Sequence, residues 1–346
     1  MNSNFYKFTK KHNKVAAFDL DGTLIKTKSK KRFPVDKNDY EYTFDNVDSK
    51  LNELIVDGYK IVIFTNQKGI YRGKTKLEDV VYKIEKLFPF ADYFISDKDD
   101  IYRKPMPGMY YEFVKLNGRP KEVFYVGDAA GRKKDHSSAD INFAHNANIK
   151  FKTQNEFFEN KKENIKPDCL TLPKNTNSID QVKELNQNVV VLMQGFPGCG
   201  KTEFIKEYVK YNNIKDYIHL SNDEYTKSKL IKEFKKGLND DKLIFIDNLN
   251  ATKKNRAEFI KLLPDDYIAV GINIKTPMDI SFQLNKQRYY DSNIDPSFKG
   301  KVRSKVPKVA YYTYKKRFEK MTKDEGIYKI IEYMPNIKLK YCFSEK

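Results

Sequence analysis

Short apolar runs of strand length recur along the whole chain, and amphipathic stretches of helical period separate them. In the first half, we expect strands at Val15–Leu20, Lys60–Thr65, Tyr93–Ser96 and Val123–Gly127, and helices at Val47–Asp57, Leu77–Leu87 and Met109–Leu116. In the second half, we expect strands at Val189–Met193, Ile218–Ser221, Lys242–Asp247 and Tyr267–Ile274, and helices at Lys201–Tyr211, Lys253–Leu263 and Met278–Tyr289. This alternation predicts parallel α/β sheets in both halves.

A polar stretch separates the two halves. Residues 157–188 contain Pro167, Pro173 and a turn cluster of Asn, Thr and Ser, a composition typical of linkers. A chain of 346 residues is long enough for two domains that each bury a core. We therefore expect a short arm at residues 1–13, one domain at 14–156, a linker at 157–188 and a second domain at 189–346.

Composition narrows the class of protein further. Purely apolar runs such as Val189–Met193 have only strand length, so we expect no membrane span. The three cysteines show no disulfide or zinc spacing, which predicts an intracellular protein of the nucleus or cytoplasm. The net charge of +18 favours polyanionic partners. Lysines spread over every solvated face would give the same net charge. The charge therefore indicates a polyanionic partner only where basic residues lie beside a candidate site.

The first chemical motif, Phe18-Asp19-Leu20-Asp21-Gly22-Thr23, directly follows an expected strand. Asp19 and Asp21 are two residues apart, so their side chains point to the same side of the strand end. One carboxylate could attack phosphorus and form an aspartyl-phosphate. The other could protonate the leaving oxygen and then activate water. Two carboxylates facing an anionic substrate also require a cation, for which Mg²⁺ is suited.

Residues at the ends of later strands supply the phosphate-binding and Mg²⁺-binding groups that the first motif does not contain. Thr65 and Asn66 offer a hydroxyl and an amide for phosphate, and Lys104 offers a positive charge. Asp128 ends the strand at Val123–Gly127 and is a candidate Mg²⁺ ligand with Asp19 and Asp21. Because parallel strands end at one edge of a sheet, we expect these groups to converge.

These segments resemble the haloacid dehalogenase superfamily of phosphohydrolases. The resemblance implies a Rossmann-like domain in which Asp19 is the nucleophile, Asp21 the general acid and base, and Asp128 a Mg²⁺ ligand. The segment between Thr23 and the next expected helix is too short for a large cap domain, so we expect the site to admit a bulky substrate. That segment is rich in basic residues, which could also form only a solvated loop: Lys26, Lys28, Lys30, Lys31 and Arg32.

The second motif is a glycine-rich loop between an expected strand and an expected helix, the setting that identifies a P-loop. Its residues are Gly195, Phe196, Pro197, Gly198, Cys199, Gly200, Lys201 and Thr202. Backbone N–H groups of such a loop point at phosphates. Lys201 would reach the terminal phosphates and Thr202 would bind Mg²⁺, so we expect ATP as the cofactor.

Candidate groups for accepting the phosphate lie downstream. Asp223 follows the second strand of this half and could deprotonate a hydroxyl. Asp247 ends a buried strand and Asn250 follows it, although Asp247 could also be a helix cap. Arg256 and Arg288 could contact the substrate or the transferring phosphoryl group, or form surface salt bridges.

Longer stretches in both halves make the pattern more specific. They are Tyr102–Pro105, Tyr125–Arg132, Lys134-Asp135, Ser138–Asp140, Gly195–Gly198, Ile246–Asn248, Val306-Pro307, Tyr314 and Phe318-Glu319. This set resembles the polynucleotide kinase 3′-phosphatase family of the animal type, over about residues 14 to 337. Where the animal enzymes have a forkhead-associated domain, we expect only the short arm at residues 1–13.

The resemblance implies a bifunctional enzyme that heals nucleic-acid ends. Its phosphatase would remove 3′-phosphates, and its kinase would transfer the γ-phosphate of ATP to 5′-hydroxyls. Asp223 would be the kinase base, and Arg256 and Arg288 would contact substrate or ATP. The products would suit a downstream ligase. We favour DNA as the substrate, and we expect the enzyme to be a monomer.

Other functions fit the same residues. An enzyme that repairs RNA ends would carry the same motifs, because contacts to a 2′-hydroxyl leave no sequence signature. A phosphatase and kinase pair for small molecules and a binding scaffold without activity are further alternatives. The chain contains no Trp, so stacking on bases must use Tyr, Phe or Arg.

Overall fold

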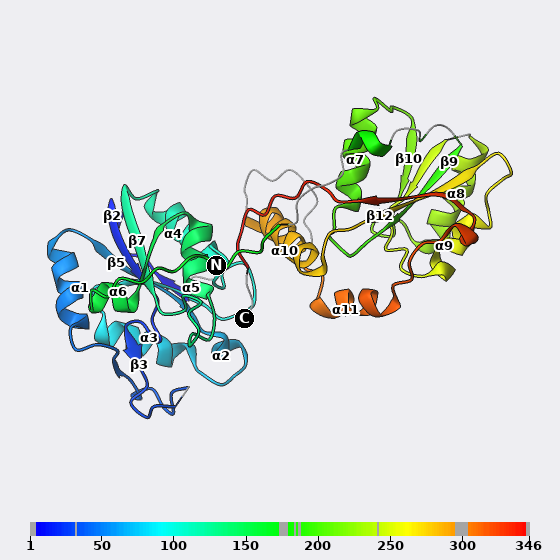
Figure 1. Cartoon of the computed structure of the whole chain (residues 1–346). Helices are drawn as coiled ribbons and strands as arrows, with labels where there is room; N and C mark the ends of the chain where they lie inside the picture. The colour runs from blue at the N-terminus through cyan, green and yellow to red at the C-terminus, as the bar shows by residue number, and fades with distance from the viewer. Residues whose placement is uncertain are drawn as a thin grey trace. The chain divides into compact units, whose positions relative to one another are not determined.

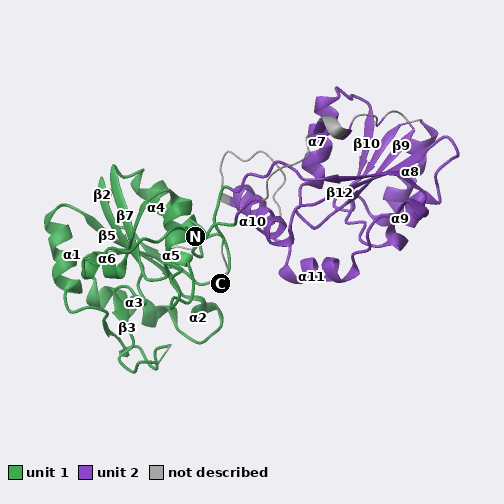
Figure 2. Ribbon diagram, viewed as in Figure 1, with its two compact units in different colours: residues 1–170, 340–346 green, residues 171–339 purple. Residues whose placement is uncertain are grey.

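The computed structural model of the chain describes residues 5–31, 33–172, 179–182, 185, 188–240, 242–294 and 304–343. These residues form two compact units (Figure 2). Unit 1 comprises residues 1–170 and 340–346, and unit 2 comprises residues 171–339. Arg32 of the basic segment and parts of the expected linker at 157–188 lie outside the described residues.

Unit 1 is a mixed α/β unit, as the alternation of strands and helices predicted (Figure 1). Its sheet has the strand order β1-β6-β5-β2-β7-β8, in which β1 is antiparallel to β6 and the other neighbours are parallel. The strands are β1 (Tyr6–Lys7), β2 (Lys14–Phe18), β5 (Lys60–Asn66), β6 (Asp92–Ser96), β7 (Glu122–Gly127) and β8 (Lys150–Thr153). The helices are α1 (Val47–Val56), α2 (Lys68–Tyr71), α3 (Leu77–Leu87), α4 (Gly108–Asn117), α5 (Ala139–Ala147) and α6 (Gln154–Phe158).

Alternating side chains of the central strands build a core on each face of this sheet. Ala16 and Phe18 of β2 pack with α1 and α3, whereas Val15 and Ala17 pack with α4 and α5. This burial on both faces explains why the strands read as continuous apolar runs. Between β2 and α1, the described residues form only the short paired strands β3 (Ile25–Lys26) and β4 (Glu41–Tyr42), which leaves this part of the chain without a cap domain.

The C-terminal segment belongs to unit 1, whereas we had assigned residues 340–346 to the second domain. Asn146 of α5 accepts a hydrogen bond from the backbone N–H of Cys342 (2.8 Å) and donates one to its carbonyl (2.9 Å). Cys342 also forms a disulfide with Cys169. The expectation of no disulfide was therefore wrong. The cysteines consequently no longer support the prediction of an intracellular protein of the nucleus or cytoplasm. The two cysteines are 173 residues apart, so their spacing gave no signal.

Unit 2 contains a parallel sheet with the strand order β10-β11-β9-β12-β13. Helix α7 covers one face, and α8 and α9 cover the other. The strands are β9 (Val189–Gln194), β10 (Tyr217–Leu220), β11 (Leu243–Ile246), β12 (Ile268–Ile274) and β13 (Ile327–Tyr333). The α-helices are α7 (Lys201–Tyr211), α8 (Lys227–Asn239), α9 (Lys253–Ile260), α10 (Met278–Ile294) and α11 (Lys308–Arg317), with 3-10 turns η2 (Ile179–Val182) and η3 (Lys323–Glu325).

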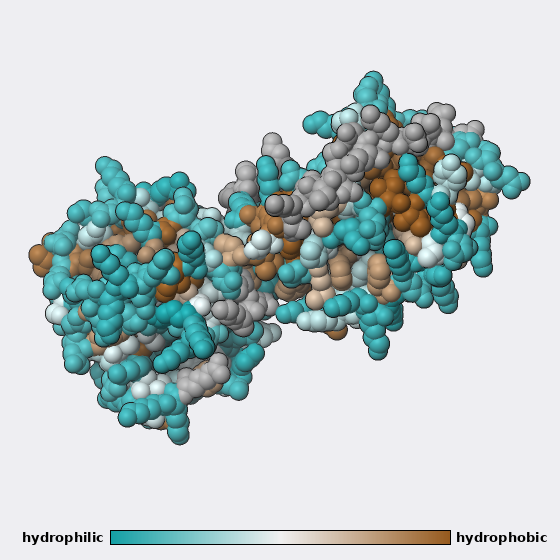
Figure 3. Space-filling view, in the orientation of Figure 1, coloured by the Kyte–Doolittle hydropathy of each residue, from teal (hydrophilic) through white to brown (hydrophobic). Residues whose placement is uncertain are grey.

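Hydrophilic side chains cover much of each unit on the face drawn in Figure 3, as the high content of charged residues requires. In the part of the chain that the structure describes, no helix is both long and apolar enough to cross a membrane.

A fully buried guanidinium links α9 to the 3-10 turn η3, which precedes β13. Arg256 is 0% exposed and donates to both carboxylate oxygens of Glu325, at 2.7 and 2.8 Å. It also donates to the carbonyls of Asn250 and Glu319. Such a bidentate pair satisfies the buried charge in a geometry that lysine cannot copy.

We predict that Arg256→Met lowers the free energy of unfolding by about 3–5 kcal/mol, because Glu325 would stay buried without its partner. Urea unfolding of the whole chain, followed by circular dichroism, measures this loss. Lys206→Met is the matched control, because Lys206 pairs with Glu203 at side chains that are 64% and 66% exposed. Its loss should stay below about 1 kcal/mol. Equal losses for the two variants would contradict this assignment.

Candidate active sites

Three carboxylates gather at the carboxyl edge of the unit 1 sheet. Asp19 directly follows β2, and Asp128 directly follows the adjacent strand β7. Asp140 lies in the first turn of α5. Oxygens of the three side chains lie within 4.8 Å of one another. The expected convergence of Asp19 and Asp128 is confirmed, and Asp140 is an additional member to which we had assigned no role.

Lys104 supplies the positive charge at this cluster. Its side chain is buried, and its Nζ donates to Asp19 Oδ1 at 2.5 Å and to Asp140 Oδ1 at 2.7 Å. Asn66 holds the backbone of Lys104 from both sides, because its Oδ1 accepts from the Lys104 N–H and its Nδ2 donates to the Lys104 carbonyl. Asn66 therefore positions Lys104, and its expected role in binding phosphate stays a prediction.

Tyr125 of β7 completes the buried network. Its hydroxyl lies 2.8 Å from Lys104 Nζ and donates to Asp140 Oδ1 at 2.8 Å. Asp140 Oδ2 accepts from the backbone N–H of Ala129. A tyrosine in a largely apolar strand and an acid in the Ser138–Asp140 stretch were the available sequence signals for these two residues.

The turn after β2 brings the backbone against Asp128. Gly22 has φ +90°, a conformation that side chains other than glycine rarely adopt. A Cβ at this position would lie 2.6 Å from Asp128 Oδ2. Thr23 donates from its Oγ1 to Asp128 Oδ1 at 3.3 Å. Gly22 therefore permits an approach that any side chain would block, and Thr23 is directed to Asp128.

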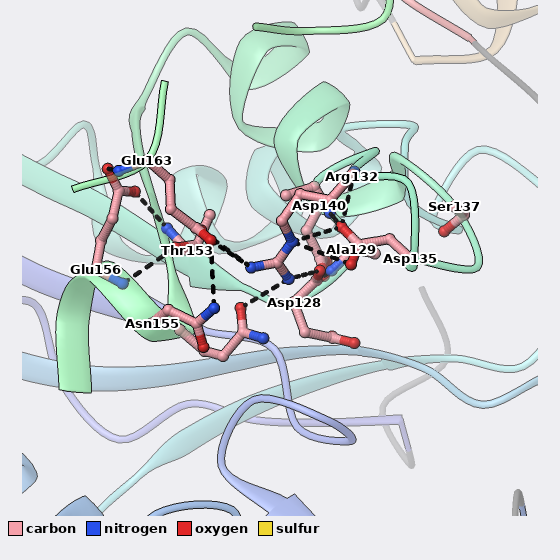
Figure 4. A network of polar contacts seen from close by, with 12 residues as sticks. Asp128, Ala129, Arg132, Asp135, Ser137, Asp140, Thr153, Asn155, Glu156 and Glu163 are labelled. Carbon is pink, nitrogen blue, oxygen red and sulfur yellow. Dashed lines mark hydrogen bonds and ion pairs between the residues drawn. The ribbon is translucent and has the colours of Figure 1, made fainter. Parts of the chain in front are cut away.

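Arg132 fixes the loop that carries Asp128. Its guanidinium donates to the Asp128 carbonyl at 2.8 Å and pairs with Asp135 and Glu163 (Figure 4). Asp135 in turn accepts hydrogen bonds from the backbone N–H groups of Ala130 and Arg132. The Gly131-Arg132 stretch and the following Asp135 are thus supports for Asp128, which the sequence pattern did not reveal.

Asp21 lies apart from the buried cluster. Its carboxylate is exposed and accepts a hydrogen bond from Gln67 Nε2, which also donates to Thr65 Oγ1 at 2.9 Å. The structure groups the side chain of Asp140, rather than that of Asp21, with Asp19 and Asp128. The expected role of Asp21 as a metal ligand stays a prediction. An exposed carboxylate two residues after Asp19 remains suited to exchanging protons with water. The Thr65 hydroxyl lies at the same sheet edge.

The charges of the cluster fit a divalent cation. Among the residues that the structure describes, Asp19, Asp128 and Asp140 face only one buried ammonium, that of Lys104. Burial raises the pKa of Asp19 well above its usual value, against the effect of Lys104. Burial, and then the charge of Asp140, raise the pKa of Asp128 to about 7. Oxygen ligands with unbalanced negative charge are the donor set that Mg²⁺ prefers.

The glycine-rich loop of unit 2 joins β9 to α7, as expected. Lys201 begins α7, and its Nζ donates to the carbonyls of Gly195 (3.2 Å) and Phe196 (3.0 Å). Gly198 has φ +70°, and a Cβ there would lie 2.9 Å from the Ser281 carbonyl of α10. The loop thus curls around the Lys201 ammonium, which is the geometry needed to hold terminal phosphates.

Asp247 organises the neighbouring strand end. It accepts a hydrogen bond from Thr202 Oγ1 at 2.6 Å, and its Oδ2 lies 3.0 Å from His219 Nε2. Burial alone would raise the pKa of Asp247, but the His219 hydrogen bond, the Lys201 charge and the Thr202 hydroxyl outweigh it and lower the pKa. A carboxylate that stays ionised beside the Thr202 hydroxyl can share a Mg²⁺ site with it. Sequence reasoning had missed His219.

The remaining candidates of unit 2 have different surroundings. Asp223 follows β10 with an exposed carboxylate, and Arg288 is exposed on α10. Asn250 is buried and donates to the carbonyls of Met193 and Ile246, so it ties the ends of β9 and β11 together. The expected contact of Arg256 with substrate is wrong for this structure, because its guanidinium is fully buried and paired with Glu325.

The raised pKa of Asp128 predicts how Mg²⁺ stabilises the protein. Between the ordinary aspartate pKa of 3.8 and about pH 7 the folded state holds a proton on Asp128 that the unfolded chain lacks, so stability without divalent cation should fall as pH rises across this range. A cation replaces that proton, so Mg²⁺ should raise Tm more at pH 8 than at pH 6. Thermal melts with Mg²⁺ or EDTA measure this. Asp128→Asn should remove the difference, and an equal rise at both pH values would contradict the assignment.

Comparison with known proteins first identifies relatives of the N-terminal half of the chain. The family described as "Polynucleotide kinase 3 phosphatase" matches residues 14–158. A polynucleotide 3′-phosphatase of Arabidopsis thaliana is 40% identical over 168 residues, covering 42% of this chain and 24% of the plant protein.

Longer matches extend over both units. A putative bifunctional polynucleotide phosphatase/kinase of Acanthamoeba polyphaga mimivirus is 31% identical over 371 aligned positions, covering 92% of this chain and 83% of the viral protein. A bifunctional polynucleotide phosphatase/kinase of Schizosaccharomyces pombe is 32% identical over 342 residues, covering 94% of this chain and 81% of the yeast protein. These matches do not separate the animal type from the fungal type, but they show that the chain belongs to the bifunctional polynucleotide phosphatase/kinase family.

Proposed function

We propose that this protein prepares broken nucleic-acid strands for ligation, with a 3′-phosphatase in unit 1 and an ATP-dependent 5′-hydroxyl kinase in unit 2. The observation that carries the proposal is that one chain holds two clusters of polar groups whose chemistry suits opposite transfers of phosphate. One is the cluster of Asp19, Asp128, Asp140 and Lys104. The other is the loop around Lys201.

In the phosphatase, Asp19 attacks the phosphorus of a 3′-phosphate while the bond to the 3′-oxygen breaks. Asp21, exposed to solvent, gives its proton to the leaving 3′-oxygen. Water then attacks the aspartyl-phosphate, Asp21 takes the proton back, and inorganic phosphate leaves. Thr65 and Lys104 bind the phosphate oxygens, and the bonds of Lys104 to Asp140 and Tyr125 keep its ammonium aimed at Asp19.

Mg²⁺ would be held by Asp19, Asp128 and Asp140, and it would offset the negative charge that these carboxylates and the substrate phosphate share. Thr23 and Arg132 keep Asp128 in place for this purpose. The short segment between β2 and α1 leaves access for a strand end rather than only for a small molecule.

In the kinase, the loop at Gly195–Thr202 binds the phosphates of ATP through its N–H groups and through Lys201. Asp223 takes the proton of the 5′-hydroxyl as that oxygen attacks the γ-phosphorus and ADP departs. Thr202 and Asp247 would hold a second Mg²⁺ at the phosphates. Arg288 is exposed on α10 and can contact ATP.

The substrate is a polyanion, which agrees with a net charge of +18. We favour DNA ends, and RNA ends are the alternative. The reaction leaves a 5′-phosphate and a 3′-hydroxyl, which are the ends that a ligase joins, so a ligase acts after this enzyme. We expect a monomer to suffice, because each site is complete within one chain.

We predict that the two activities can be removed separately. Asp19→Asn should abolish release of phosphate from a 3′-phosphorylated oligonucleotide and leave 5′-phosphorylation unchanged, because Lys104 keeps Asp140 as its ionic partner. Lys201→Ala should abolish transfer from radiolabelled ATP and leave the phosphatase unchanged. Circular dichroism serves as the control for folding. A folded variant that lost both activities would refute the assignment of one reaction to each unit.

A further inference from the structure

The last described residues of the chain belong to unit 1, although the chain passes through unit 2 before it reaches them (Figure 2). Tyr341, Cys342 and Phe343 are only 5%, 3% and 2% exposed. Chain ends are usually loose unless specific contacts hold them. We call residues 340–343 the C-terminal strap, and the reactions described above give this strap no role.

Two connections hold the C-terminal strap in unit 1. Cys342 forms a disulfide with Cys169, which lies shortly before the chain enters unit 2. The backbone N–H of Cys342 donates to Asn146 Oδ1 at 2.8 Å, and the Cys342 carbonyl accepts from Asn146 Nδ2 at 2.9 Å. The disulfide restrains the strap covalently, and the paired hydrogen bonds fix its backbone against α5.

The same amide reaches the loop that carries the lysine of the phosphatase site. Asn146 Nδ2 also donates to the carbonyl of Pro105 at 2.9 Å, and Pro105 directly follows Lys104. An amide nitrogen carries two N–H donors, so Asn146 can bond to both carbonyls at once. Asn146 is only 7% exposed. One nearly buried side chain therefore bridges the C-terminal strap to the backbone beside Lys104.

This bridge completes the support of the Lys104 backbone. Asn66 bonds to the N–H and the carbonyl of Lys104 itself, and Asn146 bonds to the next carbonyl along the chain. These contacts set the point from which the Lys104 ammonium reaches Asp19, 2.5 Å away. A displacement of about 1 Å at such a group can cost on the order of a hundredfold in rate.

We propose that the C-terminal strap is a part of the phosphatase site, because it acts through Asn146 to hold Lys104 where it meets the substrate phosphate. Asn146 is thus a positioning residue, since it contacts neither the substrate nor the reacting atoms. The proposal rests on the proposed phosphatase function. It adds to that function a dependence on the end of the chain, which is reached only after unit 2.

The test compares Asn146→Ala, Phe343→Ala and the double variant in the full chain. KM for a 3′-phosphorylated oligonucleotide and the inhibition constant of inorganic phosphate are measured for the phosphatase reaction. A displaced Lys104 binds phosphate more weakly, so each single variant should raise both constants about tenfold, the size of one hydrogen bond to a charged group. A loss of folded protein would instead lower kcat and leave both constants unchanged.

The double variant distinguishes a bridge from two independent defects. Phe343→Ala should raise neither constant further in the Asn146→Ala background, because the bridge is already broken. Phe343→Leu is the matched control, since leucine keeps an apolar side chain that seats the strap, and its constants should match those of the unaltered chain. Unchanged phosphorylation of 5′-hydroxyl ends verifies that unit 2 is intact in every variant.

Two results would overturn the proposal. Unchanged constants in either single variant would show that Asn146 and the strap only stabilise the fold. Additive increases in the double variant would show that the strap affects Lys104 by a route other than Asn146. Failure of the unaltered chain to release phosphate from the oligonucleotide is a different result, because it would refute the phosphatase function itself.

Discussion

The carboxyl edge of a parallel sheet is the constraint on which both sites depend. Parallel strands end on one side, so residues far apart in sequence meet there without a dedicated scaffold. In unit 1 this edge unites Asp19 after β2, Thr65 in β5 and Asp128 after β7. In unit 2 it unites the loop after β9 with Asp247 after β11.

Gathering acids at one edge has an electrostatic cost, which the two units offset differently. In unit 1 the Lys104 ammonium binds Asp19 and Asp140, and these two acids raise the pKa of Lys104 against the opposing effect of its burial. One ammonium cannot balance three carboxylates, so this site still favours a cation. In unit 2 Asp247 is stabilised in its ionised form by His219, Lys201 and Thr202. Its charge is therefore available in the free protein.

Sequence patterns predicted the strands and helices that carry strong periodicity. Helices α3 and α7 begin and end at the expected residues, because each has a clear apolar stripe. Helix α5 was missed, since buried polar residues such as Asn142 and Asn146 interrupt its apolar pattern. These same amides bond to the segments around Asp168 and Cys342, contacts that only the folded chain creates.

Site residues divide in a similar way. The residues that we propose to contact phosphate sit in short motifs, so Asp19 and Lys201 could be found from local sequence. Tyr125 and Arg132 also lie in a stretch that the sequence singled out, but their positioning roles depend on contacts across the fold that the stretch does not specify. Arg256 was predicted to contact substrate because it lies close to the site in sequence. In the folded chain its side chain is buried and paired with Glu325, so it has a structural role that the sequence did not show.

The central claim is that two opposite reactions serve one break, and a nicked DNA duplex tests it most directly. The nick carries a 3′-phosphate and a 5′-hydroxyl, and the full chain is added with ATP and Mg²⁺. Gel analysis of the two strands reports each end separately. The account predicts that the 3′-phosphate is removed and the 5′-hydroxyl is phosphorylated in the same incubation, so that a ligase can then seal the nick. Conversion of free mononucleotides with both ends of the nick unchanged would contradict it.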